Sequence, residues 1–170
     1  ELTFNYDMKS VGILVFKCVD DSYYSYGLCN NLIADFDRIS QVYVADIQDV
    51  MRFKSSDLTP ADIARKLEVD TVLDGVCQID GDRIHISLRM VNTETGKTVW
   101  KEELNDLIAN LNALRGIIVK NVLEVLDVQV PDFILEKMSK AMTSHPQAYK
   151  LYHQGLYKIE IVKKTEEYPT

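Results

Sequence analysis

The stretch from Thr71 to Leu104 has the pattern of three consecutive antiparallel strands. Asp80-Gly81 lies between the first two runs, and this dipeptide is a strong signal for a two-residue hairpin turn. From Arg83 to Met90 polar and apolar residues alternate, which places one face of the strand on a core and the other toward water. A second turn at 93–96 leads into the third strand. Because a meander with one apolar face is not stable by itself, we expect helices to cover that face.

Shorter elements precede the meander. The apolar run 11–16 (VGILVF) predicts a buried strand, and apolar residues at helical spacing predict a helix over 26–39. A second short strand is expected at 41–45 (QVYVA), followed by one or two helical turns over 46–53. The sequence Thr59-Pro60-Ala61-Asp62 then combines a capping residue, a first-turn proline and an early acidic residue, so it predicts a helix start.

The longest amphipathic helix is predicted over 108–125, and we expect it to lie across the sheet. After Pro131, short helices are expected over 133–142 and from Ser144 onward. Strands that alternate with helices and end in a meander predict an α/β (α+β) fold. The expected fold is a mixed five-stranded sheet with a C-terminal antiparallel meander, helices packed on it and one further C-terminal helix.

Three segments are expected: a lead-in over residues 1–10, one α/β domain over 11–130 and a helical extension over 131–170. The formal net charge of −7 argues against nucleic acid as a partner, because an acidic chain repels a polyanion. No run is long and apolar enough to span a bilayer, so no membrane contact is expected. Three cysteines without paired spacing favour a reducing compartment, hence the cytoplasm. A periplasmic location stays open, because the chain begins at Glu1 and upstream sequence is expected to be missing.

No recognisable catalytic spacing, glycine-rich phosphate loop or metal-ligand pattern is present, so neither an enzyme nor a cofactor is expected. The best candidates for a binding surface are aromatic residues. Tyr23, Tyr24 and Tyr26 are expected in the loop before the first helix, where they would line a partner surface or a ligand pocket. The alternative is that they staple and cap that helix. A second candidate surface is the apolar side of the last helix, with Tyr149, Tyr152 and Leu156.

Several segments together resemble the TolB amino-terminal-like domain of multidomain bacterial signalling proteins. The matching residues are Ile63–Val69 (IARKLEV), Val72–Val76 (VLDGV), Gly81–Ile84 (GDRI), Val91–Gly96 (VNTETG) and Trp100. The resemblance covers roughly residues 11–128. It implies a mixed-sheet module that scaffolds or senses, as in class III adenylate or guanylate cyclases and membrane-linked transcription regulators.

The tail resembles the start of a tetratricopeptide repeat, on the residues His145-Pro146, Ala148-Tyr149, Leu151-Tyr152 and Gly155. The alternative is a plain amphipathic helix packed on the domain. Together the two resemblances imply a non-catalytic regulatory module whose partners are proteins or other domains of the same chain. Pairing with a second copy is also expected, because a truncated repeat leaves apolar surface. The competing hypothesis is a small-molecule sensor or small enzyme with a pocket near residues 19–26.

Overall fold

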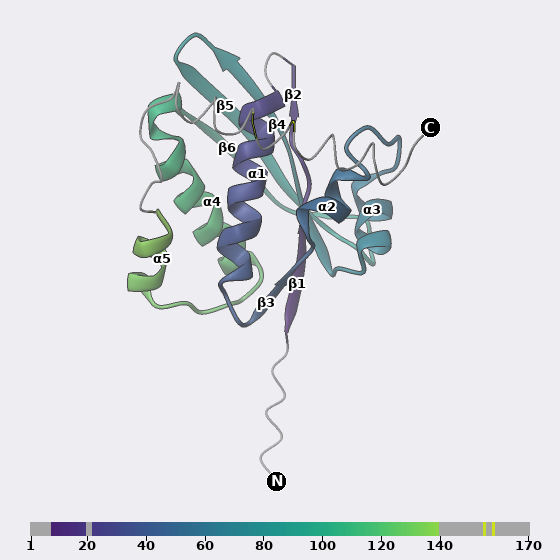
Figure 1. The fold of residues 1–170 in the computed structure, drawn as a ribbon. Helices are drawn as coiled ribbons and strands as arrows, with labels where there is room; N and C mark the ends of the chain where they lie inside the picture. The colour runs from purple at the N-terminus through teal and green to yellow at the C-terminus, as the bar shows by residue number, and fades with distance from the viewer. Residues whose placement is uncertain (1–7, 20–21, 140–154, 156–157, 159–170) are drawn as a thin grey trace.

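The computed structural model of the protein describes residues 8–19, 22–139, 155 and 158, and it shows one mixed sheet with helices on both sides (Figure 1). The strand order is β3-β1-β4-β5-β6, and β2 pairs with β4 beyond the end of β1. The strands are β1 (Lys9–Ile13), β2 (Lys17–Cys18), β3 (Val42–Val44), β4 (Thr71–Asp80), β5 (Arg83–Asn92) and β6 (Thr98–Leu107). The helices are α1 (Ser22–Asp37), α2 (Ile47–Met51), α3 (Pro60–Leu67), the short 3₁₀ turn η1 (Ile108–Asn110), α4 (Leu111–Val125) and α5 (Asp132–Ser139).

The predicted fold class is confirmed. Strand β1 runs parallel to β3 and to β4, whereas β4, β5 and β6 form the predicted antiparallel meander. Two predicted helix beginnings are also present. Helix α3 begins after Thr59, which caps it as expected, and η1, which leads into α4, begins after residue 107. The predicted tetratricopeptide-like helix from Ser144 onward lies outside the described residues.

The first strand is interrupted, which gives the sheet six strands where five were expected. Ile13 pairs with Leu73 and Lys17 pairs with Val76, so four steps along the first strand match three steps along β4. One extra residue in a strand produces a bulge. The prediction of one unbroken strand over 11–16 was therefore wrong, and pairing extends outward to Lys9 and to Cys18.

Two side chains of α1 satisfy backbone carbonyls at this bulge. The Ser25 hydroxyl donates to the Phe16 carbonyl, and the Cys29 thiol donates to the Leu14 carbonyl with Sγ 3.0 Å from the oxygen. Burial raises the pKa of the Cys29 thiol to about 12 and the Asp74 charge adds to the shift, although a hydrogen bond from the Phe16 backbone opposes it. The thiol therefore stays protonated at neutral pH and serves as a structural donor.

The β4–β5 hairpin turns one residue later than predicted. Strand β4 continues through Asp80, and the two turn residues are Gly81 and Asp82. Only Gly81 has a positive φ (60°), which is the pattern of a turn with glycine at its first central position. The second predicted turn is confirmed, because Gly96 has a φ of 69° and donates its N–H to the Asn92 carbonyl at 2.9 Å.

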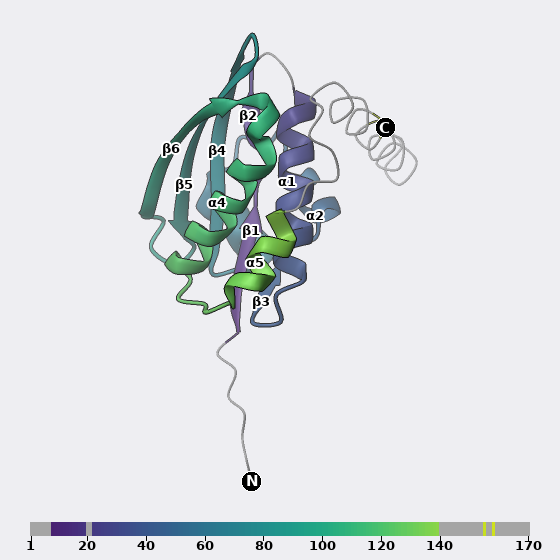
Figure 2. The ribbon, with the colours of Figure 1, turned by 90° about the vertical axis from the view of Figure 1, so that its left-hand side faces the viewer.

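The core has two parts, one on each side of the sheet. The larger part lies between the sheet and the helices α1 and α4, which Figure 2 shows on the same side of β4–β6. It contains the predicted apolar positions of β5, which are Ile84, Ile86, Leu88 and Met90. The smaller part lies under α2 and α3 and takes in Val72 and Val91. The helices α2 and α3 therefore cover only one end of the second face of the sheet.

A buried ion pair joins the two large helices. Arg115 of α4 places Nε 2.8 Å from Oδ2 of Asp35 on α1, and both side chains are less than a tenth exposed. Burial raises the pKa of Asp35 to about 6, although the charges of Arg115 and Arg38 oppose this shift. The helical layer therefore contains one charged contact whose strength depends on pH.

Candidate functional site: the open face of the meander

The meander presents one face that none of the helices described within residues 8–139 covers over most of its length. This open face carries the alternate side chains of three strands, with β2 at its margin. The residues are Lys17, Asp74, Val76, Gln78, Asp80, Arg83, His85, Ser87, Arg89, Val99, Lys101, Glu103, Asn105 and Leu107. Val76 is 43% exposed and Val99 is 52% exposed, which confirms that this side of the sheet reaches solvent.

The same alternation that buries one face creates the other. Strand β5 sends its even-numbered apolar residues into the core and its odd-numbered polar residues outward. Strand β4 follows the same rule, with Cys77 buried and its neighbour Val76 exposed. Since side chains alternate with a period of two, the sequence that fixes the core also fixes the composition of the open face.

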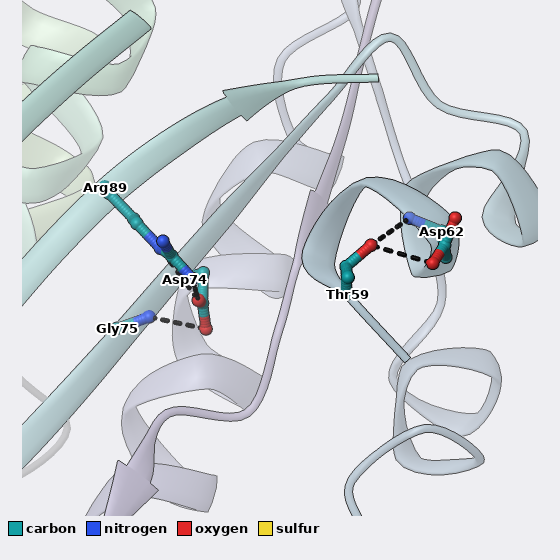
Figure 3. Close-up of polar contacts among 5 residues, drawn as sticks. All are labelled: Thr59, Asp62, Asp74, Gly75 and Arg89. Carbon is teal, nitrogen blue, oxygen red and sulfur yellow. Dashed lines mark hydrogen bonds and ion pairs between the residues drawn. The ribbon is translucent and has the colours of Figure 1, made fainter. Parts of the chain in front are cut away.

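An ion pair lies at the end of the open face nearest α2 and α3. Arg89 of β5 donates from Nε (3.1 Å) and Nη2 (2.9 Å) to Oδ2 of Asp74 on the neighbouring strand. The other carboxylate oxygen of Asp74 accepts the Gly75 N–H at 2.9 Å. Figure 3 shows that this leaves both oxygens of Asp74 engaged. The carboxylate is thus fixed in place with little capacity to accept further hydrogen bonds.

A hollow of about 260 Å³ lies beside this ion pair. Two cross-strand rows build it. The first row runs Lys17, Val76, Ser87, Glu103, and the second runs Asp74, Arg89, Lys101. Gly75 and Leu88 complete the lining. The hollow therefore has an apolar and small-residue centre with charged side chains around it.

A second, smaller cavity of about 90 Å³ adjoins the first, because both are lined by Lys17, Asp74 and Arg89. Its far wall is the segment between α2 and α3 and includes Phe53 and Leu58. The two hollows form one shallow depression that runs from this segment toward β6.

The wall of the depression is held by the start of α3, where Thr59 and Asp62 bond to each other (Figure 3). The Asp62 backbone N–H donates to Thr59 Oγ1, and the Thr59 hydroxyl donates to the Asp62 carboxylate at 2.8 Å. The Thr59 hydroxyl holds the pKa of Asp62 below its usual value, and Arg65 adds to this effect. The cap fixes where the segment between α2 and α3 meets the helix.

His85, Ser87 and Glu103 form a cluster at the middle of the open face. Oε2 of Glu103 lies 2.6 Å from His85 Nε2 and accepts the Ser87 hydroxyl at 2.7 Å. In an acyl-transfer triad, serine donates to histidine so that the histidine can remove its proton. Here both side chains point to the same carboxylate oxygen, so the histidine does not contact the serine hydroxyl as a base. In this arrangement the cluster ties β5 to β6 and contains no serine–histidine contact.

Metal ligation finds no support in the described part of the chain. Within residues 8–19 and 22–139, the histidine, cysteine and acidic side chains form no group of three that could hold an ion. None of the helices described there has the length and apolar character needed to cross a bilayer. The chemistry available at the open face is hydrogen bonding, charge pairing and burial of small apolar patches.

The structure places the predicted tyrosines within a helix. Helix α1 begins at Ser22, four residues earlier than expected, so Tyr23, Tyr24 and Tyr26 occupy its first turns and do not form a loop. Tyr24 and Tyr26 are only 7% and 3% exposed, and Tyr24 belongs to the larger core. This burial fits the alternative of a packed helix start. A partner surface at this segment stays a prediction, with Tyr23 as its most accessible tyrosine.

The other predicted surface residues, Tyr149, Tyr152 and Leu156, lie outside the described residues. The open face was not singled out from the sequence, although its signal is present. The outward-facing positions of β5 carry charged and hydrogen-bonding side chains, which are Arg83, His85, Ser87 and Arg89. The pattern alone did not show that helices would leave this face uncovered.

Comparison with known proteins places the fold. No protein-family model matches the chain. It is 22% identical over 132 residues to "Putative adenylate cyclase 3" of Rhizobium meliloti (strain 1021), a match that covers 78% of this chain and 22% of that protein. The structure of TolB from Acinetobacter baumannii superposes with a TM-score of 0.52 at 12% identity, over 70% of this chain and 28% of TolB. Lipoprotein GNA1162 from Neisseria meningitidis gives a TM-score of 0.49 at 17% identity, over 72% of this chain and 99% of that one.

The chain thus spans less than a third of both the cyclase and TolB. The TolB superposition confirms the fold that the sequence resemblance implied. The tetratricopeptide and signalling parts of the resemblance stay predictions.

Proposed function

We propose that this chain is a non-catalytic regulatory module of a larger bacterial signalling protein, and that it acts through contact with a protein or with another domain. The observation that carries this proposal is the open face of the meander. A face with ordered charges and a shallow depression suits contact with a macromolecule better than it suits catalysis. Its most reactive side chains are engaged with one another, as in the His85–Glu103 and Asp74–Arg89 pairs.

The likeness to a putative adenylate cyclase supports one version of this proposal. In that version, the matched segment controls the output of a nucleotide cyclase domain elsewhere in the protein. A partner that binds the module would favour one of two arrangements of the complete protein and so change cyclase turnover. The effect cannot exceed the difference in the partner's binding free energy between the two arrangements.

The test compares the complete gene product with a form that lacks residues 8–139, both assayed for formation of cyclic AMP and cyclic GMP. We expect the deletion to change turnover several-fold while the KM for the nucleotide changes little. We also expect the 170-residue chain alone to form neither product. Equal activity in the two forms, or turnover by the chain alone, would contradict the proposal.

A further inference from the structure

We propose that the open face binds an extended acidic segment of a partner protein, with two carboxylates four residues apart and one apolar side chain midway between them. The inference rests on the proposed regulatory function and names the surface and the chemistry of the partner. Three observations carry it: unmatched hydrogen-bond donors at two margins of the hollow, an apolar centre, and the distance between those margins.

The donors come from two lysines. Lys17 ends one cross-strand row and Lys101 ends the neighbouring row, and both line the hollow. Within the described residues, neither ammonium is within ion-pair distance of a carboxylate. Each ammonium carries three N–H donors and no acceptor. An incoming ligand therefore meets free donors at both margins.

The lining of the hollow has more positive than negative side chains. Lys17, Arg89 and Lys101 are cationic, whereas Asp74 and Glu103 are acidic, so three positive charges stand against two negative ones. Asp74 accepts from Arg89 and from the Gly75 backbone, and Oε2 of Glu103 accepts from Ser87 and lies beside His85. The hollow therefore has a local excess of positive charge, although the chain as a whole has a net charge of −7. This local excess favours a ligand that brings carboxylates.

The centre of the hollow favours an apolar side chain. Val76 lies in the middle of the first row and is 43% exposed. Gly75 lies beside it and adds no side chain to the lining of the hollow. The hollow of about 260 Å³ is large enough for one leucine or phenylalanine side chain.

The spacing of the lysines sets the spacing of the ligand. Strands β2, β4, β5 and β6 are adjacent, so Lys17 and Lys101 are separated by three strand-to-strand steps. They also lie two residues apart along the strands, because Lys17 shares a row with Glu103 and Lys101 lies in the next row. At about 4.8 Å a step and ~3.3 Å a residue their Cα positions are roughly 16 Å apart, ~3 Å more than four residues of extended chain cover, a difference within the reach of the lysine side chains. In an extended segment the side chains at i, i+2 and i+4 point the same way. An acid-x-apolar-x-acid segment that crosses the strands would therefore reach both lysines and the hollow together.

The test measures binding of a fluorescein-labelled peptide, SESFSES, to the 170-residue chain by anisotropy, with ¹⁵N NMR to locate the contact. We expect saturable binding with Kd below ~1 mM, and shifts of the Val76, Ser87 and Lys101 amides. We expect the double variant Lys17→Glu, Lys101→Glu to weaken binding about tenfold or more. The matched control, Lys66→Glu with Lys120→Glu, makes the same change in net charge on exposed residues of α3 and α4 and should leave Kd within about twofold.

Three further peptides test each element of the ligand. SKSFSKS reverses the charges, SESGSES removes the anchor, and SEESFSS has the same composition with the wrong spacing; each should bind at least several-fold more weakly. The proposal is overturned if SESFSES shows no saturable binding, if the control variant weakens it equally, or if the amide shifts map elsewhere. Binding to phosphatidylglycerol vesicles tests the alternative of a lipid surface. The proposal is also overturned if the wild type binds these vesicles, the lysine double variant does not, and no peptide binds. If the peptide fails but deletion of residues 8–139 still alters output, only this assignment falls and the regulatory proposal stands.

Discussion

Asp35 and Arg115 face each other inside the helical layer, with a carboxylate oxygen 2.8 Å from a guanidinium nitrogen. The pair links α1 to α4, the two helices that cover the core side of the meander. A buried ion pair of this kind is weak evidence for stability, because the cost of removing two charges from water offsets most of their attraction. Removing only one of the two side chains is strongly destabilising, since the other charge is then left buried without its partner.

We therefore expect Arg115→Met to reduce the free energy of unfolding by about 3–5 kcal/mol. The double variant Asp35→Leu, Arg115→Met removes both charges and should recover most of that loss, within about 1–2 kcal/mol of the wild type or above it. Urea denaturation of the wild type, Asp35→Leu, Arg115→Met and the double variant gives the coupling energy. Additive losses in the double variant would show that the two side chains act independently.

The raised pKa of Asp35 makes stability depend on pH. Its ordinary pKa is 3.8, and burial raises the pKa to about 6 in the folded chain. Between these values the folded state binds more protons than the unfolded state, so stability falls as pH rises from about 4 to about 6. The loss from this group is at most about 3 kcal/mol, because one pKa unit corresponds to about 1.36 kcal/mol.

Urea titrations of the wild type and of Asp35→Asn at pH 4, 5 and 6.5 isolate this effect. Asp62 and Asp106 have lowered pKa values and act in the opposite direction, but both are present in each chain. We expect the fall in stability toward pH 6.5 to be smaller in Asp35→Asn. Parallel pH profiles for the two chains would mean that Asp35 does not titrate in this window.

Gly75 should not tolerate a side chain, because an ideal Cβ would lie 2.8 Å from the Ser87 carbonyl oxygen and 3.1 Å from Phe16 and Leu88. Backbone on a central strand cannot easily move aside, so we expect Gly75→Ala to cost about 1–3 kcal/mol. Gly81→Asn is the matched control: the position has a positive φ, which asparagine tolerates, and no atoms within 4 Å of an added Cβ. Thermal unfolding of both variants distinguishes them, and a neutral Gly75→Ala would show that the bulge region is more adaptable than this packing implies.

The cap of α3 should be worth about 1 kcal/mol, the usual loss when a capping threonine becomes alanine. Thr59→Ala removes the acceptor of the Asp62 N–H and the hydroxyl that lowers the pKa of Asp62. Ser55→Ala, in the exposed segment just before, provides a control with no hydrogen bond to lose among those the structure shows. Chemical denaturation should give a clear loss for the first variant and none for the second, and the NMR titration of Asp62 should shift upward only in Thr59→Ala.

The sequence was most informative where one local pattern decided the outcome. The alternation over 83–90 predicted which side of β5 is buried, and Thr59-Pro60 predicted the start of α3. The break at Leu14 to Phe16 could not be predicted, because the reason for it lies in contacts with Ser25 and Cys29 on a different element. The apolar run showed only that the segment would be buried.

The candidate site was missed for a related reason. Tyr24 and Tyr26 were predicted to be surface residues because they are aromatic. Large rings at the start of a helix pack inward, however, when a sheet lies beneath the helix. Among the described helices, α2 and α3 are the ones that pack on this side of the sheet, and how far they extend over it decides how much of the face is open. No local sequence pattern predicts how far these helices extend, although the basic residues of β5 and β6 are typical of an exposed face.

The claim that the two faces of the meander differ, and that one is available to a partner, is tested most directly at positions 76 and 77. In a Cys18→Ser background, Val76→Cys places a thiol on the open face beside Cys77, which is buried. Alkylation rates by mass spectrometry should show rapid labelling of position 76, slow labelling of Cys77 and protection of position 76 when SESFSES is added. Equal protection of both thiols in the free chain would contradict the open face, and unchanged labelling of position 76 under saturating peptide would contradict its role as a binding surface.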